Sequence, residues 1–228
     1  MEAGVSSAFR LDENVATRVS AVDLVRTALR RAIIRGDLPG GSQLVQTDIA
    51  SQLNVSTTPV REAMRDLAAE GLITLDSHRI GTVRQLNWND MAEIVEVRRS
   101  LEAVAINHAM ANMTEDLLDK ARVLADELSG ENDLGEWVEK NNRFHGTFHD
   151  ATNTKRLSAI LKSLEEAAGV FVAQAQRLHP EIRRRAVKDH FDLIDAYVNK
   201  DVEAAVQIQY GHLNLPLESV GQDTDVGT

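Results

Sequence analysis

The spacing of apolar residues predicts three helices in the first third of the chain. Apolar positions recur every three or four residues over 20–35, which predicts an amphipathic helix that a Gly- and Pro-rich segment then breaks. Thr47 is placed to cap a short second helix that reaches Leu53. Ser56, followed by two threonines and a proline, predicts the start of a third helix over about 57–70. A hydroxyl cap and an early proline both suit the first turn of a helix.

Two short apolar strands follow the third helix, at 72–75 and 81–84, with a polar turn between them. Two short helices at a sharp turn, followed by a hairpin, predict a winged helix-turn-helix domain over residues 17–86. The helix over 57–70 is then the one whose N-terminal end enters the major groove of DNA. Residues 1–16 carry no such pattern and are assigned to an N-terminal tail.

The rest of the chain has a helical pattern throughout, and residues 87–216 predict a second, all-α domain. Its six predicted helices span 90–112, 115–129, 134–151, 155–178, 180–199 and 201–213. The short connections between them favour an antiparallel bundle. Pro216 and the Gly- and Asp-rich residues after it predict a frayed C-terminal tail over 217–228. The predicted fold class is therefore mainly α, with one small β wing.

Composition removes several classes of function. The 228 residues include no cysteine, which excludes a disulfide framework, a thiolate zinc site and a cysteine nucleophile. No apolar run approaches the ~18–20 residues that a membrane helix needs. We therefore expect a cytoplasmic protein without a membrane partner.

The charge of the chain is divided unevenly between its two halves. A net charge of −10 argues against nucleic acid as a partner, but only for the chain as a whole. Residues 1–84 hold 10 Arg, no Lys and 10 Asp and Glu, so their net charge is zero and residues 85–228 carry all the excess acidity. This asymmetry predicts two domains with different partners, and the first remains compatible with DNA.

The predicted helix over 57–70 carries groups suited to DNA at its leading end. Thr57 and Thr58 place hydroxyls beside a helix N-terminus, which favours phosphate. Arg61 is placed to reach a guanine edge, the commonest specific contact in the major groove. The alternative is that Arg61 and Arg65 are ordinary surface charges.

Four polar residues of the second domain stand on apolar helix faces. Asn141 and His145 are four residues apart, so they lie one above the other on the same face. His190 and His212 occupy later helices beside apolar residues. Three imidazoles and one amide oxygen could close around a divalent metal in the bundle core. From spacing alone, the alternative is that these histidines are hydrogen-bonded or exposed without a ligand.

A run of motifs gives the first domain a specific resemblance. The segments are IIRGDLPG (33–40), VSTTPVREA (55–63) and EGLI (70–73). Together they resemble the N-terminal domain of GntR-family bacterial transcription regulators. The resemblance implies DNA contacts from Thr47, Ser56, Thr57, Thr58, Arg61 and the wing residues Ser77, His78 and Arg79. The family usually has Arg in place of Thr57 and often in place of Thr47, so we expect an operator different from the family's common one and a weaker salt dependence.

The second domain resembles the effector-binding domain of the FadR-type (FCD) subgroup of that family, over residues 90–214. The resemblance implies metal ligands at Asn141, His145, His190 and His212, a metal such as zinc or nickel, and a small carboxylic acid held beside it. Arg98 matches a clamp for the effector carboxylate, with Glu102 four residues later as its intrahelical partner. His149, four residues after His145, is a rival ligand, and we expect it at the helix rim.

Asn141 stands where the subgroup usually has Asp. An amide oxygen is neutral, so the site keeps one more positive charge. That weakens metal retention and favours an anionic effector.

These features predict a transcriptional regulator, with a repressor favoured, rather than an enzyme. Two protomers would present their winged helices to a pseudo-palindromic operator. A small organic acid would control operator affinity by binding two arrangements of the dimer differently. Three alternatives stay open: a metal-responsive regulator, a metal-dependent hydrolase, and an interaction domain whose histidines bind nothing.

Overall fold

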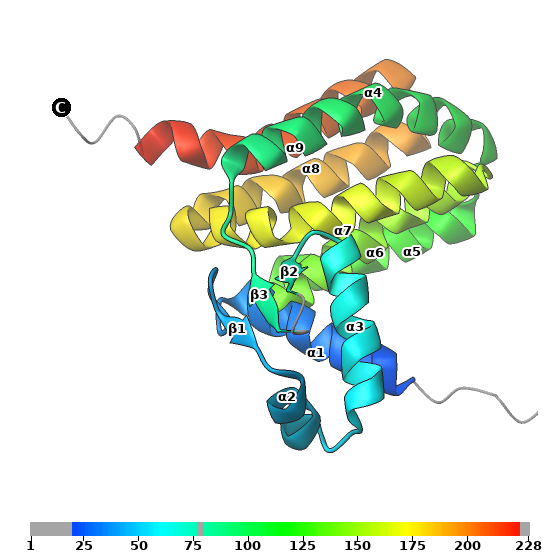
Figure 1. The fold of residues 1–228 in the computed structure, drawn as a ribbon. Helices are drawn as coiled ribbons and strands as arrows, with labels where there is room; N and C mark the ends of the chain where they lie inside the picture. Colours follow the sequence, from blue (N-terminus) through cyan, green and yellow to red (C-terminus); the bar gives the residue numbers. More distant parts are fainter. Residues whose placement is uncertain (1–19, 77–79, 224–228) are drawn as a thin grey trace, which may run out of the picture.

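The computed structural model describes residues 20–76 and 80–223, which form two bodies (Figure 1). The first contains α1 (Ala21–Arg35), β1 (Gln43–Leu44), α2 (Gln46–Leu53), α3 (Thr57–Ala69), β2 (Ile73–Leu75) and β3 (Gly81–Val83). The second contains α4 (Trp88–Asn112), α5 (Glu115–Gly130), α6 (Leu134–Ala151), α7 (Lys155–Leu178), α8 (Pro180–Val198) and α9 (Val202–Asp223). The predicted fold class, a winged helix-turn-helix followed by a helical bundle, is confirmed. Within the described residues, no helix combines the length and apolarity needed to span a membrane.

Capping and one apolar face explain α1. Ser20 Oγ accepts a hydrogen bond from the backbone N–H of Asp23 at 3.0 Å, and Gly36 ends the helix with a φ of 82°. The apolar face packs on α3, the helix expected to enter DNA. The fully buried members of this core are Val25, Val60, Ala63, Met64 and Leu67.

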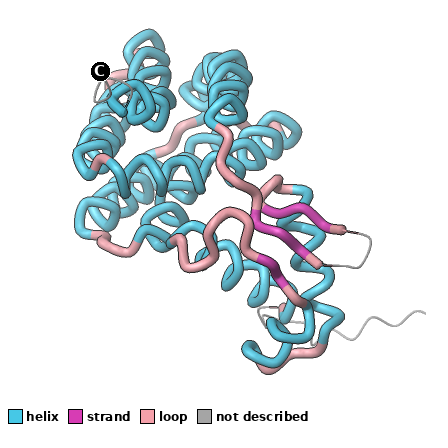
Figure 2. The backbone as a smooth tube through the Cα atoms, turned by 60° about the vertical axis from the view of Figure 1, so that its left-hand side comes forward, coloured by secondary structure: helices cyan, strands magenta, loops and turns pink. Residues whose placement is uncertain are grey.

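The strands of the first body form an antiparallel sheet in the order β1-β3-β2 (Figure 2). The sequence predicts only the hairpin of β2 and β3. The added strand β1 places Leu44 opposite Gly81 and buries it. A Cβ at Gly81 would come within 2.6 Å of the Met64 side chain, so the absence of a side chain lets the sheet approach α3 closely. A strand of two residues has no periodicity that sequence analysis could detect.

The expected capping role of Thr47 is wrong. α2 begins at Gln46, and its N-cap is Val45, which makes no side-chain cap. Thr47 therefore lies inside the first turn, where its exposed hydroxyl donates to Asp48 at 3.2 Å. Pairing of the buried Leu44 in β1 fixes where the helix begins, and that tertiary contact outweighs the local capping preference.

The six helices of the second body pack as an antiparallel bundle, as predicted. α6 contacts α4, α5 and α7, and its Trp137 and Phe144 are fully buried in the main core. Thr114 and Asp133 cap α5 and α6 with their side chains. α4 begins at Trp88, two residues before the predicted start.

The predicted end of the last helix is wrong. α9 continues through Pro216 to Asp223, so 217–223 belong to the helix rather than to the expected tail. Proline inside a helix removes one backbone hydrogen bond. Here Leu213 and Leu215 are buried in the bundle, and Ser219 Oγ donates to the carbonyl of Pro216 at 2.6 Å. Burial of the leucines holds the helix in spite of the proline.

The two bodies dock through α1, which lies against α6 and α7. Ile34 of α1 joins the core of the bundle, and Val170 of α7 packs against both cores. Arg177 of α7 donates to the carbonyl of Ile34 at 2.9 Å, near the C-terminus of α1. A cation there is favourable because the end of a helix carries unpaired carbonyls and partial negative charge.

Ion pairs surround this apolar contact. Arg31 is 2.6 Å from Glu136 and binds both oxygens of Glu139, at 2.7 and 2.5 Å. Arg35 lies 3.0 Å from Asp133. The basic face of α1 thus meets the acidic start of α6, and part of the excess acidity of the second domain neutralises arginines of the first.

Charge reversal of Arg31 tests this docking. Arg31→Glu places like charges against Glu136 and Glu139 and should lower the free energy of unfolding, measured with urea. Adding Glu139→Arg should recover part of the loss, with a coupling energy of about 0.5–1 kcal/mol because the pair is partly exposed. Arg26→Glu is the control, since Asp23 on its own helix is the one ion-pair partner of Arg26 among the described residues. Zero coupling in the double variant would contradict a specific pair.

Candidate metal and effector site

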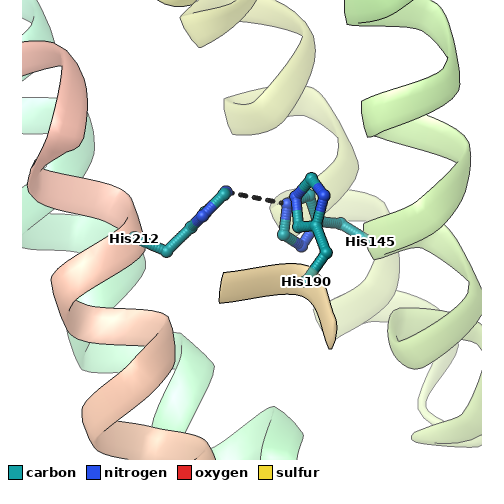
Figure 3. Close-up of side chains that lie close together, drawn as sticks. All are labelled: His145, His190 and His212. Carbon is teal, nitrogen blue, oxygen red and sulfur yellow. Dashed lines mark hydrogen bonds between the residues drawn. The ribbon is translucent and has the colours of Figure 1, made fainter. Parts of the chain in front are cut away.

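Three helices bring three histidines together inside the bundle (Figure 3). His145 lies on α6, His190 on α8 and His212 on α9, and one ring nitrogen of each lies within 4.8 Å of the others. The Nε2 atoms of His145 and His212 are 3.2 Å apart. His145 and His190 are buried, and His212 is half-buried. Residues 45 and 22 positions apart in the chain thus converge on one point.

The electrostatics of the two buried histidines favour the neutral imidazole. Burial, together with His212 and His190, lowers the pKa of His145 well below its usual value. Burial and His212 do the same for His190. Neutral imidazole is the form that binds metals. Neither ring nitrogen of His190 has a hydrogen-bond partner among the described residues, so this ring can offer a nitrogen to a ligand.

Neighbouring side chains fix the orientation of the rings. His190 packs against Phe144 with ring centroids 4.3 Å apart. Nδ1 of His212 is 3.4 Å from a carboxylate oxygen of Asp189, within ion-pair range although not aligned as a hydrogen bond. A carboxylate on one imidazole nitrogen directs the other nitrogen toward a ligand, as around many metal centres.

Asn141 lies on the same cavity as His145 and His212. Its side chain is buried, and its Oδ1 has no hydrogen-bond partner among the described residues. A buried acceptor without a partner is costly, so this oxygen also fits a ligand position. The four residues implied by the family resemblance thus share one place in the fold.

A buried network of charges adjoins the histidines. Arg98 Nη2 donates to Glu102 at 2.8 Å, the intrahelical pair expected from sequence, and lies 3.7 Å from Glu165 on α7. His149 Nε2 is 3.3 Å from Glu102, and its Nδ1 is 3.9 Å from Glu165. All four side chains are buried. The expectation that His149 lies at the helix rim is wrong, because its side chain is buried. Its Nε2 is engaged by Glu102, which argues against a role as a metal ligand.

The two carboxyl groups of the network have opposite electrostatics. Burial opposes the ionisation of Glu102, but Arg98 and His149 outweigh it and hold the pKa of Glu102 at about 2. Burial raises the pKa of Glu165 to about 7, because Arg98 and His149 offset it only in part. Burial opposes protonation of His149 too, yet the charge of Glu102 raises its pKa. Glu102 is thus the permanent anion of the network, whereas Glu165 is protonated below neutral pH and ionises near it.

Arg98 lines the same cavity as Asn141, His145 and His212. Its pairing with Glu102 fixes the guanidinium, and its buried Nε has no partner among the described residues. The position suits the expected effector clamp, although Glu165 already shares the guanidinium. Sequence reasoning missed Glu165, whose signal was a lone acid on the apolar face of a helix.

The expected DNA-binding residues lie on a separate surface. Ser56, Thr57 and Thr58 are exposed at the N-terminus of α3, and the side chain of Ser56 makes no cap hydrogen bond. Arg61 lies one turn later, half-buried and without an ion-pair partner in the described part of the chain. Thr47 of α2 is also exposed. Ser77, His78 and Arg79 lie outside the described residues.

Two family models match the chain in this same order. The model "Bacterial regulatory proteins, gntR family" covers residues 22–83, and the FCD domain model covers residues 93–215. The chain belongs to the GntR family, with an FCD domain. It is therefore a DNA-binding transcriptional regulator, and the hydrolase alternative falls away because family and relatives are regulators rather than enzymes.

Known proteins agree with this assignment. The chain is 44% identical over 90 residues, 39% of each chain, to the "Probable D-xylose utilization operon transcriptional repressor" of Paenarthrobacter nicotinovorans. It is 29% identical over 203 residues to the gluconate operon transcriptional repressor of Bacillus subtilis (strain 168), covering 82% of this chain and 78% of that one. The fold is similar to that of E. coli McbR/YncC, with a TM-score of 0.77, 23% identity, and 91% and 100% of the two chains covered.

Removing the carboxyl group of Glu165 tests the network. A raised pKa favours the protonated form in the folded state, so wild-type stability should fall as the pH rises from 4.5 toward 7. Glu165→Gln cannot ionise, and its stability relative to wild type should be about 2.5 kcal/mol more favourable at pH 8 than at pH 5. Urea unfolding at both pH values measures this.

The control is Glu93→Gln, which removes one exposed negative charge from α4. A Glu165→Gln difference that stays constant between the two pH values would show that this carboxyl ionises normally.

Proposed function

We propose that this regulator is a repressor whose operator affinity is controlled by a small organic acid. The acid binds beside a divalent metal in the bundle, and both are held by the residues around the histidine cluster. The observation that carries this proposal is the meeting of three histidines inside the bundle. Burial lowers the pKa of two of them, His145 and His190, and neither ring nitrogen of His190 has a hydrogen-bond partner among the described residues. A site of that kind in an FCD domain suits a small-molecule effector rather than a macromolecule.

The proposed metal ligands are His145, His190 and His212, with Asn141 completing the set. Imidazole nitrogens with one amide oxygen suit zinc or nickel better than magnesium or calcium, which prefer oxygen. When bound, the metal would serve as a Lewis acid that anchors a carboxylate. Asn141 leaves the positive charge of the metal less neutralised than Asp would, and Arg98 adds a second cationic contact, so the cavity favours an anion.

The proposed assembly is a homodimer on a pseudo-palindromic operator. Val97 and Val104 on α4, with Ile160 on the adjoining α7, are among the most exposed large apolar side chains of the described chain. Exposed apolar groups on neighbouring helices favour a protein contact. Two protomers would then present two copies of α3 to successive half-sites.

The proposed sign of regulation rests on the relatives. Two of those reported above are named as repressors of sugar or sugar-acid operons. A metal-responsive regulator is the second candidate, because ligand nitrogens of the three histidines lie within 4.8 Å of one another, a spacing that suits a metal without an acid. Operator affinity that changes with zinc or nickel alone, and not with added acids, would favour that second candidate.

Metal content tests the site directly. Protein purified without a metal-affinity tag or chelator should hold about one zinc or nickel ion per chain by elemental analysis. The variant His145→Ala/His190→Ala should lose it, because two of three imidazoles are gone. His108→Ala is the matched control, since His108 is an exposed histidine on α4. Metal retained by the double variant would overturn the ligand set.

Arg61→Ala tests the DNA surface. If Arg61 contacts a base edge, affinity for the DNA upstream of the protein's own gene should fall by about 1–3 kcal/mol, measured by fluorescence anisotropy. Arg122→Ala is the control, because Arg122 pairs with Glu115 and Asp119 on α5. Equal losses on specific and random DNA would make Arg61 a phosphate contact. No loss at all would show that α3 does not enter the groove as proposed.

A further inference from the structure

Two uncharged donors share the cavity with the histidines. Trp137 of α6 and Gln176 of α7 line it together with Asn141, His145 and His212. Both side chains are buried, at 0% and 3% exposure. Neither Trp137 Nε1 nor Gln176 Nε2 has a hydrogen-bond partner among the described residues. Buried donors without partners are rare and costly, so these two point to a group that the protein alone does not supply.

Arg183 determines which end of the Gln176 amide faces the cavity. Gln176 Oε1 accepts from Arg183 Nε at 3.1 Å. A guanidinium can only donate, so the oxygen of the amide must be the atom on that side. Arg183 is itself held by the backbone carbonyl of Glu131 at 3.1 Å. The amide is therefore fixed with its N–H groups toward the cavity.

Trp137 presents its indole N–H in a similarly fixed way. An indole nitrogen donates and cannot accept. The ring is held in the core and lies nearly parallel to His190, at 24° with ring centroids 6.2 Å apart. The cavity therefore has donors on Trp137, Gln176 and Arg98, whereas Asn141 offers an acceptor beside the histidines.

We propose that Trp137 and Gln176 determine effector specificity by donating hydrogen bonds to a second oxygen-bearing group of the acid. The effector is then a hydroxy acid or a dicarboxylic acid, with one oxygen group at the metal and the other at these donors. A simple monocarboxylic acid leaves the donors unsatisfied, and an ammonium group at that end would meet donors only. This inference rests on the proposed function, because it describes the same cavity.

The position of Gln176 gives the effector a direct route to the DNA-binding domain. The next residue, Arg177, donates to the carbonyl of Ile34 in α1. Eleven residues earlier on α7, Glu165 contacts Arg98 while Glu166 lies 3.8 Å from Arg30 of α1. In each of these two pairs of consecutive residues on α7, the first residue contacts the cavity or Arg98, which lines it, and the second contacts α1. An occupant that shifts α7 would change both at once.

Binding of simple acids tests the proposal. Zinc-loaded protein is titrated by calorimetry with acetate, malonate and malate as probes. We expect malonate or malate to bind at least tenfold more tightly than acetate. Gln176→Leu should reduce that preference about tenfold and leave the affinity for acetate within twofold. Gln207→Leu, the same change at an exposed position on α9, should keep the preference.

A second variant covers the case in which Gln176→Leu does not fold. Trp137→Phe retains an aromatic ring and removes only the donor group, and it should reduce the same preference. In a Trp88→Phe background, Trp137 is the one remaining tryptophan of the chain, and its fluorescence should respond to malonate and malate more than to acetate.

The outcomes separate this inference from the function on which it rests. Zinc-loaded protein that binds none of the acids overturns the proposed effector site and the inference with it. Acids that bind without preference, or with a preference unchanged in both donor variants, overturn the inference alone. In that case water satisfies the two donors, and the effector site at the metal and Arg98 still stands.

Discussion

The burial of polar groups without protein partners is the constraint on which the rest of this structure depends. His190, Asn141, Trp137 and Gln176 all present such atoms inside the helical bundle. Each unsatisfied group costs free energy that the surrounding apolar packing must offset. A ligand that satisfies several of these groups at once would stabilise the folded state through its own binding energy. Sensing and stability are therefore coupled in the same few side chains.

The contact between the two domains combines one apolar anchor with partly exposed ion pairs. Ile34 supplies the apolar anchor, and the pairs of Arg31 with Glu136 and Glu139 surround it at partly exposed positions. Such pairs contribute little individually and weaken with salt. The domain arrangement is thus held less firmly than either core, as a regulator needs if ligand binding is to change it. Some of the acidic residues that give the second half of the chain its negative charge pair here with arginines of α1.

Sequence patterns were sufficient wherever a feature is local. Ser56 and the early Pro59 located the start of α3, although the Ser56 side chain makes no cap hydrogen bond. Helical periodicity located the six helices of the bundle. The patterns failed where a distant contact decides, as at β1, which depends on pairing with Gly81, and at Pro216, which burial of neighbouring leucines keeps within α9. Family resemblance identified the histidines, and the structure brings them together. Gln176 could not be found in this way, because its role depends on how Arg183, on the next helix, orients its amide.

Along α7, two pairs of neighbouring residues divide their contacts between the cavity and α1, and this spacing has a consequence for how such proteins diverge. Each residue of an α-helix advances by about 100° around the axis. Inserting or deleting one residue between Glu165 and Gln176 would turn one of the two consecutive pairs away from both the cavity and α1. Substitutions can alter the cavity or the docking contacts one residue at a time, whereas the spacing between the pairs has to be inherited intact. Among proteins that share this mechanism, the length of this helix segment should therefore vary less than the identity of the residues on it.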